Sequence, residues 1–246
     1  QSDIPLGHKI STRAIRKGEP VLKYNTVIGY ASRDVEAGTH MHNDTIHFDA
    51  VAQDAPFCVD YRPVELVPPA QRRTFLGYVR KDGQVGTRNC IAVIVCSNCA
   101  ATVARKIADH FTETVLRNYP NVDAVVPLIT SSGCGLEKTG TPMIYLRRIL
   151  AGHIRNPNMA GALVCALGCE SNNIDAFFEE TGLTPGPMLR RLVIQEAGGA
   201  HRAVKAGITQ VEAMLPAANQ CRRQPVPISH LTVGLECGGS DSFSGS

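Results

Sequence analysis

Cysteines recur in short loops rich in glycine, serine and asparagine, and each loop follows a stretch that we predict to be a β-strand. These loops are residues 96–99, 131–135, 168–173 and 237–241. Ligands of open α/β sheets bind where the carboxyl ends of the strands meet. Glycines let the backbone of such loops approach a ligand, and the helices that follow direct positive N-termini at an anion. The spacing therefore predicts a ligand site lined by thiols.

The pair Cys96 and Cys99 has the CxxC spacing, which leaves three interpretations open. A redox pair requires a thioredoxin-like unit. A zinc site requires a second CxxC, which the sequence lacks. Cysteines at strand ends are also often simply small buried apolar side chains. Four cysteines at four equivalent strand ends favour a pocket over packing alone.

Two further groups of polar residues lie outside these loops. His40 and His42 alternate in a β-rich stretch, so they share a face and can bind a metal together, with an exposed polar pair as the alternative. Arg88 and Asn89 precede the first apolar strand. The guanidinium there can bind a carboxylate through two hydrogen bonds, with solvated surface as the alternative.

Alternating apolar stretches predict the elements that position these residues. A continuous apolar run at 91–95 is typical of a strand buried on both faces. Thr141 and Pro142 are placed to cap and begin a helix. Strands are predicted at 91–95, 122–129, 160–167, 192–195 and 231–236, and helices at 100–116, 142–154, 173–180 and 203–215. This alternation predicts an α/β domain with a mostly parallel sheet.

The N-terminal part has a different pattern. Short extended pieces at 9–11, 20–24, 27–32 and 45–48, separated by turn residues, predict a small all-β module. Prolines and scattered charges then predict a linker. We therefore expect a β module at 1–48, a linker at 49–74 and the α/β domain at 75–246.

Composition excludes several classes of partner. The net charge of +3, without blocks of like charge or any tryptophan, argues against nucleic acid. No apolar run is long enough for a membrane span, and no signal peptide is visible at the start. Nine cysteines, an odd number in a chain of this size, favour free or metal-bound thiols in a reducing cytoplasm.

Motifs along the whole chain resemble the altronate/galactarate dehydratase family. They are TFLGYVRKDGQVGTRN at 74–89, YPNVDAVV at 119–126, GCG at 133–135, ALGCESNN at 166–173 and GLECGGSDSFSG at 234–245. GHKI, GEPVLKYNTVIGYA and AGTHMHN, between residues 7 and 43, resemble the small SAF or β-clip module of that family. Family members continue for about as long again, so the chain resembles their front half.

The resemblance implies a hydro-lyase that dehydrates a sugar acid, of the altronate or galactarate type, to a 2-keto-3-deoxy product. It also implies a Rossmann-like α/β domain, a small-molecule substrate and an Fe(2+) cofactor, with Mn(2+) as a substitute. Loop position and motif together give the candidates. They are Ser240, Asp241 and Glu170 for catalysis; Arg88, Asn89, His8, Asn172, Gly238 and Gly239 for substrate binding; and Cys134, Cys169 and Cys237 for the metal.

Two other interpretations remain open from the residues. Three of the cysteines can instead hold an iron–sulfur cluster in a dehydratase. The chain can also be a non-catalytic ligand-binding or assembly protein. Self-association into a homo-oligomer is compatible with each of these interpretations.

Overall fold

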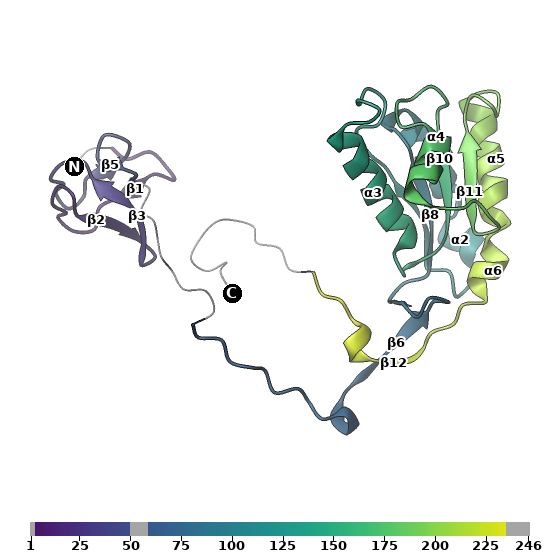
Figure 1. Cartoon of the computed structure of the whole chain (residues 1–246), viewed down its shortest axis with the longest axis horizontal. Helices are drawn as coiled ribbons and strands as arrows, with labels where there is room; N and C mark the ends of the chain where they lie inside the picture. Colours follow the sequence, from purple (N-terminus) through teal and green to yellow (C-terminus); the bar gives the residue numbers. More distant parts are fainter. Residues whose placement is uncertain (1–2, 50–58, 235–246) are drawn as a thin grey trace. The chain divides into compact units, whose positions relative to one another are not determined.

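The computed structural model describes residues 3–49 and 59–234, which fall into two compact units (Figure 1). The first is a β module within residues 1–66, and the second is an α/β unit that spans Val67–Thr232. The division falls inside the segment 49–74 that we predicted to be a linker. The described part of that segment contains one short 3-10 helix, η1 (Pro69–Gln71), before a strand begins at Thr74.

The β module consists of short antiparallel strands: β1 (Lys9–Ile10), β2 (Pro20–Lys23), β3 (Thr26–Ala31), β4 (His40–Met41) and β5 (Ile46–His47). β2, β3 and β5 form one sheet, and β1 pairs with β4. Tyr24 and Asn25 both have positive φ, as a tight two-residue hairpin loop requires. The predicted strands of this module are confirmed with small shifts at their ends. Its core is Ile15, Val21, Ala31, Val35 and Met41.

The α/β unit contains a parallel sheet in the order β11-β10-β8-β9. Its strands are β8 (Cys90–Val95), β9 (Ala124–Leu128), β10 (Met159–Ala166) and β11 (Leu189–Val193). The chain runs from β8 outward to β9 and then returns to β10 on the other side of β8. The winding direction thus changes between β8 and β10, which is where such sheets bind ligands. The predicted parallel α/β fold is confirmed.

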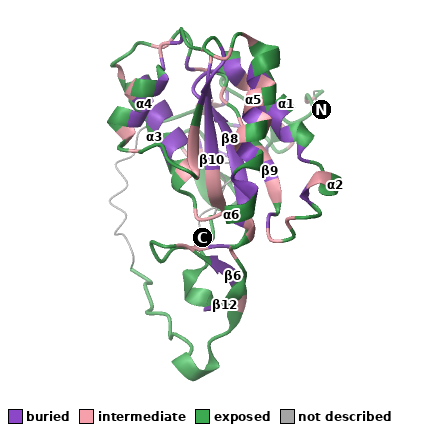
Figure 2. Cartoon of the chain, turned by 90° about the vertical axis from the view of Figure 1, so that its right-hand side faces the viewer, coloured by how far each residue is buried: buried purple, intermediate pink, exposed green. Residues whose placement is uncertain are grey.

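Helices cover both faces of this sheet (Figure 2). Ile91, Val93 and Val95 of β8 belong to the core with α1 (Ala101–His110) and α5 (Ala200–Glu212). Ile94 and Cys96 belong to the opposite core, with α3 (Thr141–Arg155) and α4 (Ile174–Thr181). Burial on both faces explains why β8 is apolar at every position. None of the helices in the described ranges is long and apolar enough to cross a membrane.

Three predictions about helix ends are wrong in detail. The helix expected at 100–116 ends at His110, because Phe111 leaves the helical conformation to bury its ring, and α2 (Glu113–Leu116) follows separately. The helix expected at 203–215 is α5 followed by α6 (Leu215–Asn219). Gly140, not Thr141, is the N-cap of α3, although Pro142 lies in its first turn as predicted.

The strand predicted at 231–236 is not found. Residues 231–234 are not in a strand, and residues 235–236 lie outside the described part of the chain. Leu231 and Val233, whose apolar character suggested a strand, are exposed. Instead β12 (Gln224–Pro227) pairs antiparallel with β6 (Thr74–Val79), which also pairs with β7 (Val85–Gly86). The prolines of β12 are tolerated because it is an edge strand.

Candidate active site

The loops after β8, β9 and β10 are joined by direct hydrogen bonds. The backbone N–H of Asn98 donates to the carbonyl of Ser132 at 2.9 Å. Asn172 N–H donates to Gly133 O at 3.0 Å, and Ser171 donates to Cys134 O from both its N–H (3.2 Å) and its hydroxyl (2.8 Å). The predicted meeting of these three loops at one edge of the sheet is confirmed. They meet where the winding direction of the sheet changes.

Gly133 is required for this close approach. Its φ is +96°, a conformation that other residues rarely adopt. A Cβ at this position would lie 2.3 Å from the carbonyl oxygen of Cys96 and 2.9 Å from the Cα of Ser97. The loop after β9 can therefore pass against the end of β8 only with glycine here.

Three exposed thiols, those of Cys99, Cys134 and Cys169, lie together at this edge. All three are free. A hydrogen bond with Cys99 raises the pKa of Cys134, and the nearby Cys169 and Glu170 raise it further. The structure thus brings these cysteines together without a disulfide, as predicted. Cys237, with Gly238, Gly239, Ser240 and Asp241, lies outside the described residues.

Cys96 differs from these three thiols because it is completely buried. Burial raises the pKa of its thiol from 9.0 to about 12, and the charge of Glu170 adds to the effect. Only Cys99 of the CxxC pair is exposed. This arrangement does not favour the redox-pair interpretation, because the reactive thiol of such a pair has a lowered pKa, whereas burial raises the pKa of Cys96.

Glu170, a candidate base or ligand, is buried in the loop after β10. One carboxylate oxygen accepts from the N–H of Leu167 at 2.7 Å and from the hydroxyl of Ser97 at 3.4 Å. The other accepts from the N–H of Gly168 at 2.5 Å. Both oxygens therefore hold the loop in shape.

Asn172, a candidate for substrate binding, is instead a fully buried link between two elements. Its amide donates to the carbonyl of Cys96 at 2.9 Å, and its carbonyl accepts from Arg147 Nε at 3.0 Å. Arg147 also forms an ion pair with Glu180. Sequence reasoning missed Arg147. The signal was available, because this cation interrupts the apolar stripe of Met143, Leu146 and Leu150 on a predicted helix.

A cavity of about 410 Å³ opens beside the loop after β10. Its lining includes the side chains of Lys138, Arg147, Cys169, Glu170 and Glu180. The first N–H groups of α4 do not face it freely, because the Asn173 side chain accepts from Asp175 and Ala176. Two of the N–H groups at the start of α4 are thus already used, and the cationic side chains in the lining of this cavity are those of Lys138 and Arg147.

Arg88 and Asn89 do not join this site, because they precede β8 and lie at the opposite end of the sheet. Asn89 is fully buried and donates to the carbonyls of Asn121 at 2.6 Å and Ala218 at 2.9 Å. Arg88 is exposed and lies 3.7 Å from Asp123. The predicted carboxylate site at Arg88 and Asn89 is thus not supported, and Asn89 joins structural elements.

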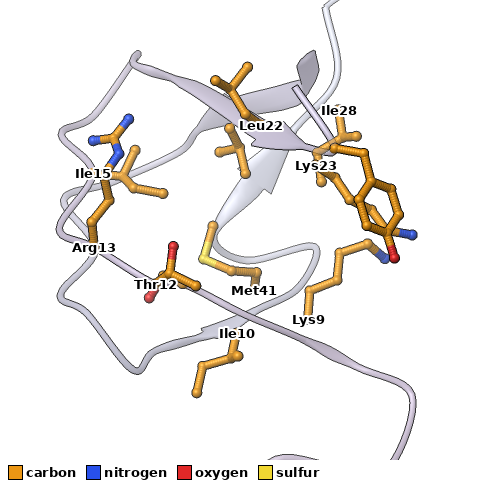
Figure 3. A pocket seen from close by; sticks show the side chains of 12 residues that line it. Lys9, Ile10, Thr12, Arg13, Ile15, Leu22, Lys23, Ile28 and Met41 are labelled. Carbon is orange, nitrogen blue, oxygen red and sulfur yellow. The ribbon is translucent and has the colours of Figure 1, made fainter. Parts of the chain in front are cut away.

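His8, the candidate from the β module, contacts another imidazole. Its Nδ1 lies 2.8 Å from Nε2 of His40. Lys9, Ile10 and Met41 of the β1–β4 pair line a hollow of about 330 Å³ (Figure 3). Among residues 3–49 and 59–234, no three His, Cys, Asp or Glu side chains are already arranged to hold a metal ion.

Comparison with known families gives two matches along the chain. Residues 77–219 match the model described as D-galactarate dehydratase/altronate hydrolase, second domain. Residues 1–49 match the altronate/galactarate dehydratase SAF domain. The two matched regions correspond to the α/β unit and the β module.

Similar proteins of known function agree with these matches. The chain is 31% identical to the altronate dehydratase of Bacillus subtilis (strain 168) and 32% identical to that of Escherichia coli (strain K12). Each alignment covers 100% of this chain and 48% of the relative. Galactarate dehydratase (L-threo-forming) of Escherichia coli (strain K12) is 29% identical over 98% of this chain and 47% of its own length. The chain thus spans about half the length of these relatives.

Proposed function

We propose, since this chain belongs to the D-galactarate dehydratase/altronate hydrolase family, that it forms part of a hydro-lyase acting on a sugar acid. The product is a 2-keto-3-deoxy acid, and the acid binds at the thiol-bearing edge of the α/β unit. One observation carries this proposal. Three loops from separate strands, bearing Cys99, Cys134 and Cys169, are bonded to one another where the winding of the sheet changes.

Removal of water from a sugar acid sets three requirements. The carboxylate must be bound, the weakly acidic α-proton must go to a base, and the departing hydroxide must receive a proton. Lys138 lines the cavity and supplies positive charge for a carboxylate, whereas the charge of Arg147 is already paired with Glu180. For the proton transfers we propose Ser240 at the leaving hydroxyl and Asp241 as base or ligand, from their place in the CGGSD motif.

The donor set of this edge suits iron(II) better than manganese(II). Thiols are soft donors, whereas manganese prefers carboxylate, carbonyl and water oxygens. Cys134 and Cys169, with Cys237 from the motif that follows, are the residues that we propose to hold Fe(2+). A divalent ion would supply Lewis-acid stabilisation of the charge that develops as the α-proton leaves.

A second candidate is an iron–sulfur dehydratase, favoured by the same three free thiols at one edge. The two candidates differ in colour. A cluster gives anaerobically purified protein a broad visible absorption that is lost with the cluster. A mononuclear site leaves the protein nearly colourless and restores activity when iron(II) is added.

The test is an anaerobic assay of the full-length protein that contains this chain, with iron(II) and with altronate and galactarate in parallel. Cys169→Ala should lower kcat at least about tenfold, since loss of a group that supports a metal site costs that much or more. Cys221→Ala is the matched control, because Cys221 lies near Arg80, away from the cavity. No turnover of either acid by the unaltered protein would refute the proposal.

Assembly and location complete the proposal. The outward side of α3 exposes Ile144, Tyr145 and Ile149, which supports self-association of the chain. Light scattering after size-exclusion chromatography tests this, with Tyr145→Glu expected to shift the mass downward.

All cysteines that the structure describes are free, which supports a reducing compartment and hence the cytoplasm.

A further inference from the structure

Three histidines share one face of the β1–β4 pair. The antiparallel register places Lys9 opposite Met41 and Ile10 opposite His40. Continuing this register by one residue places His8 opposite His42. Met41 is buried in the core of the module. Since side chains alternate along a strand, His40 of β4 points away from that core. His8 and His42 lie just outside β1 and β4, and their rings contact the ring of His40 on that side.

The three imidazole rings are in mutual contact. Ring centroids lie 4.9 Å apart for His8 and His40, 5.3 Å for His40 and His42, and 5.8 Å for His8 and His42. His8 and His42 are exposed, and His40 is half-buried. Within the described ranges, no carboxylate forms an ion pair with any of the three, whereas His47 in the same module pairs with Asp49 at 3.2 Å.

The contact of the three rings brings several imidazole nitrogens into one small region. Neutral imidazole is the form that binds transition metals. Three nitrogen donors with solvent on one side provide the ligands of a metal site that keeps a coordination position open.

We propose that His8, His40 and His42 bind one divalent transition metal ion of the class that imidazole prefers, such as Zn²⁺, Co²⁺ or Fe²⁺. An open hollow of about 510 Å³ lies beside it, lined by His8, His42, Asn43 and Phe48 among others. A small oxygen-bearing ligand in this hollow can complete the coordination. The site lies in the β module and does not depend on the dehydration proposed above.

The metal-free rings need only a small rearrangement. Two ligands at right angles on one ion, each about 2.1 Å from it, lie about 3 Å apart. Nδ1 of His8 and Nε2 of His40 are already 2.8 Å apart, as a hydrogen-bonded pair. When both of these nitrogens bind the ion, the ring that donated the hydrogen bond carries its proton on its other nitrogen instead, so both rings stay neutral. The ring of His42 must then turn its nitrogen toward the same point, which we expect to cost little because this side chain is exposed.

The test is titration of the full chain with Co²⁺ after removal of metal by a chelator. The imidazoles of the wild-type chain should bind one Co²⁺ with a d–d absorption and no charge transfer of their own, whereas any Co²⁺ at the thiols of Cys134 and Cys169 adds a thiolate-to-metal charge-transfer band. His8→Gln and His42→Gln should each weaken this binding by more than about tenfold. His47→Gln is the matched control and should leave the affinity unchanged, with circular dichroism confirming the fold of each variant.

A second measurement needs no variant. Zn²⁺ should protect His8, His40 and His42 of the wild-type chain from diethyl pyrocarbonate, as mapped by mass spectrometry, and leave His47 and His153 reactive. A variant in which Cys99, Cys134 and Cys169 are all changed to serine distinguishes metal bound at these thiols from metal bound at the histidines. This variant should retain the imidazole site. Loss of the d–d band in that variant, or equal Co²⁺ affinity in His42→Gln and wild type, would overturn the proposal.

Discussion

Two regions of the chain gather side chains that can bind metal, but they are built differently. One is the edge of the α/β unit that bears Cys99, Cys134 and Cys169, here called the thiol edge. The other is the face of the β module that bears His8, His40 and His42, here called the imidazole face. At the thiol edge, backbone groups and buried polar side chains fix the loops, through Glu170, Asn172 and Arg147. At the imidazole face, two-residue strands present three rings whose described partners are one another. The first site is shaped by the fold before any ligand arrives, whereas the second is shaped by side chains that can still turn.

The largest expected effect concerns the buried network of the thiol edge. Asn172→Ala should lower the free energy of unfolding of the α/β unit by about 2–4 kcal/mol, because the carbonyl of Cys96 and Nε of Arg147 each lose a buried partner. Asn173→Ala, one residue later, should cost only about 1 kcal/mol as a lost helix cap. Urea unfolding followed by helical circular dichroism measures both, since every described α-helix lies in this unit. An equal loss of unfolding free energy in the two variants would show that the buried hydrogen bonds of Asn172 do not fix the loop.

The next effect comes from buried thiols at high pH. The pKa of Cys96 is about 12 in the folded chain against 9.0 ordinarily, and burial also raises the pKa of Cys90 and of Cys165. Above pH 9 the unfolded chain therefore holds fewer protons than the folded chain, so stability falls as pH rises. Cys96 alone should contribute about 1 kcal/mol of loss between pH 9 and 10. Unfolding curves at both pH values should show a shallower pH dependence in Cys96→Ala, whereas Cys169→Ala should keep the wild-type slope.

The sequence predicts the thiol edge well because its determinants are local. A strand buried on both faces is apolar at every position, as in β8, and its end is marked by the loop residues that follow. Parallel pairing then brings the loops after β8, β9 and β10 together without further information. The fold class and the clustering of Cys99, Cys134 and Cys169 were therefore predictable.

Contacts between distant residues were not predictable in the same way. Asn172 looks like a pocket residue in the sequence, and only the position of Arg147, 25 residues earlier, shows that its side chain is already used. The side-chain amide of Asn89 similarly donates a hydrogen bond to the carbonyl of Ala218, a residue that is distant in the sequence. The apolar stretch at 231–234 has the composition of a strand, but a strand also needs a neighbouring strand to pair with. The strand that forms in this part of the chain is instead β12, which pairs with β6 at the edge of a different sheet.

A smaller effect tests how closely the exposed thiols interact. Hydrogen bonding to Cys99 raises the pKa of Cys134, so less of its reactive thiolate is present near pH 8. Cys99→Ala removes this cause and should speed alkylation of Cys134 by iodoacetamide several-fold, as followed by mass spectrometry of the Cys134 peptide. Cys221→Ala should leave the rate unchanged. An unchanged rate in Cys99→Ala would mean that the two thiols do not share a hydrogen bond in solution.

The smallest expected effect lies at the imidazole face. His8→Gln and His42→Gln should each change the stability of the metal-free β module by less than about 0.5 kcal/mol, because both side chains are exposed and outside the core. Met41→Ala, between His40 and His42 in the sequence, should cost about 2 kcal/mol or more, since Met41 is a buried core residue. Amide hydrogen exchange at Val21 and Ala31, inside the sheet of the module, measures these changes without interference from the α/β unit.

A large loss of protection in either histidine variant would mean that the rings are part of the module's packing, and the contrast between the two regions would disappear. A small loss in the metal-free chain, together with a clear gain in protection when Zn²⁺ is added to wild type but not to His42→Gln, has the opposite meaning. Ligand binding would then supply stability that the short β1–β4 pair lacks by itself, because an ion that binds only the folded module stabilises it in proportion to its free concentration.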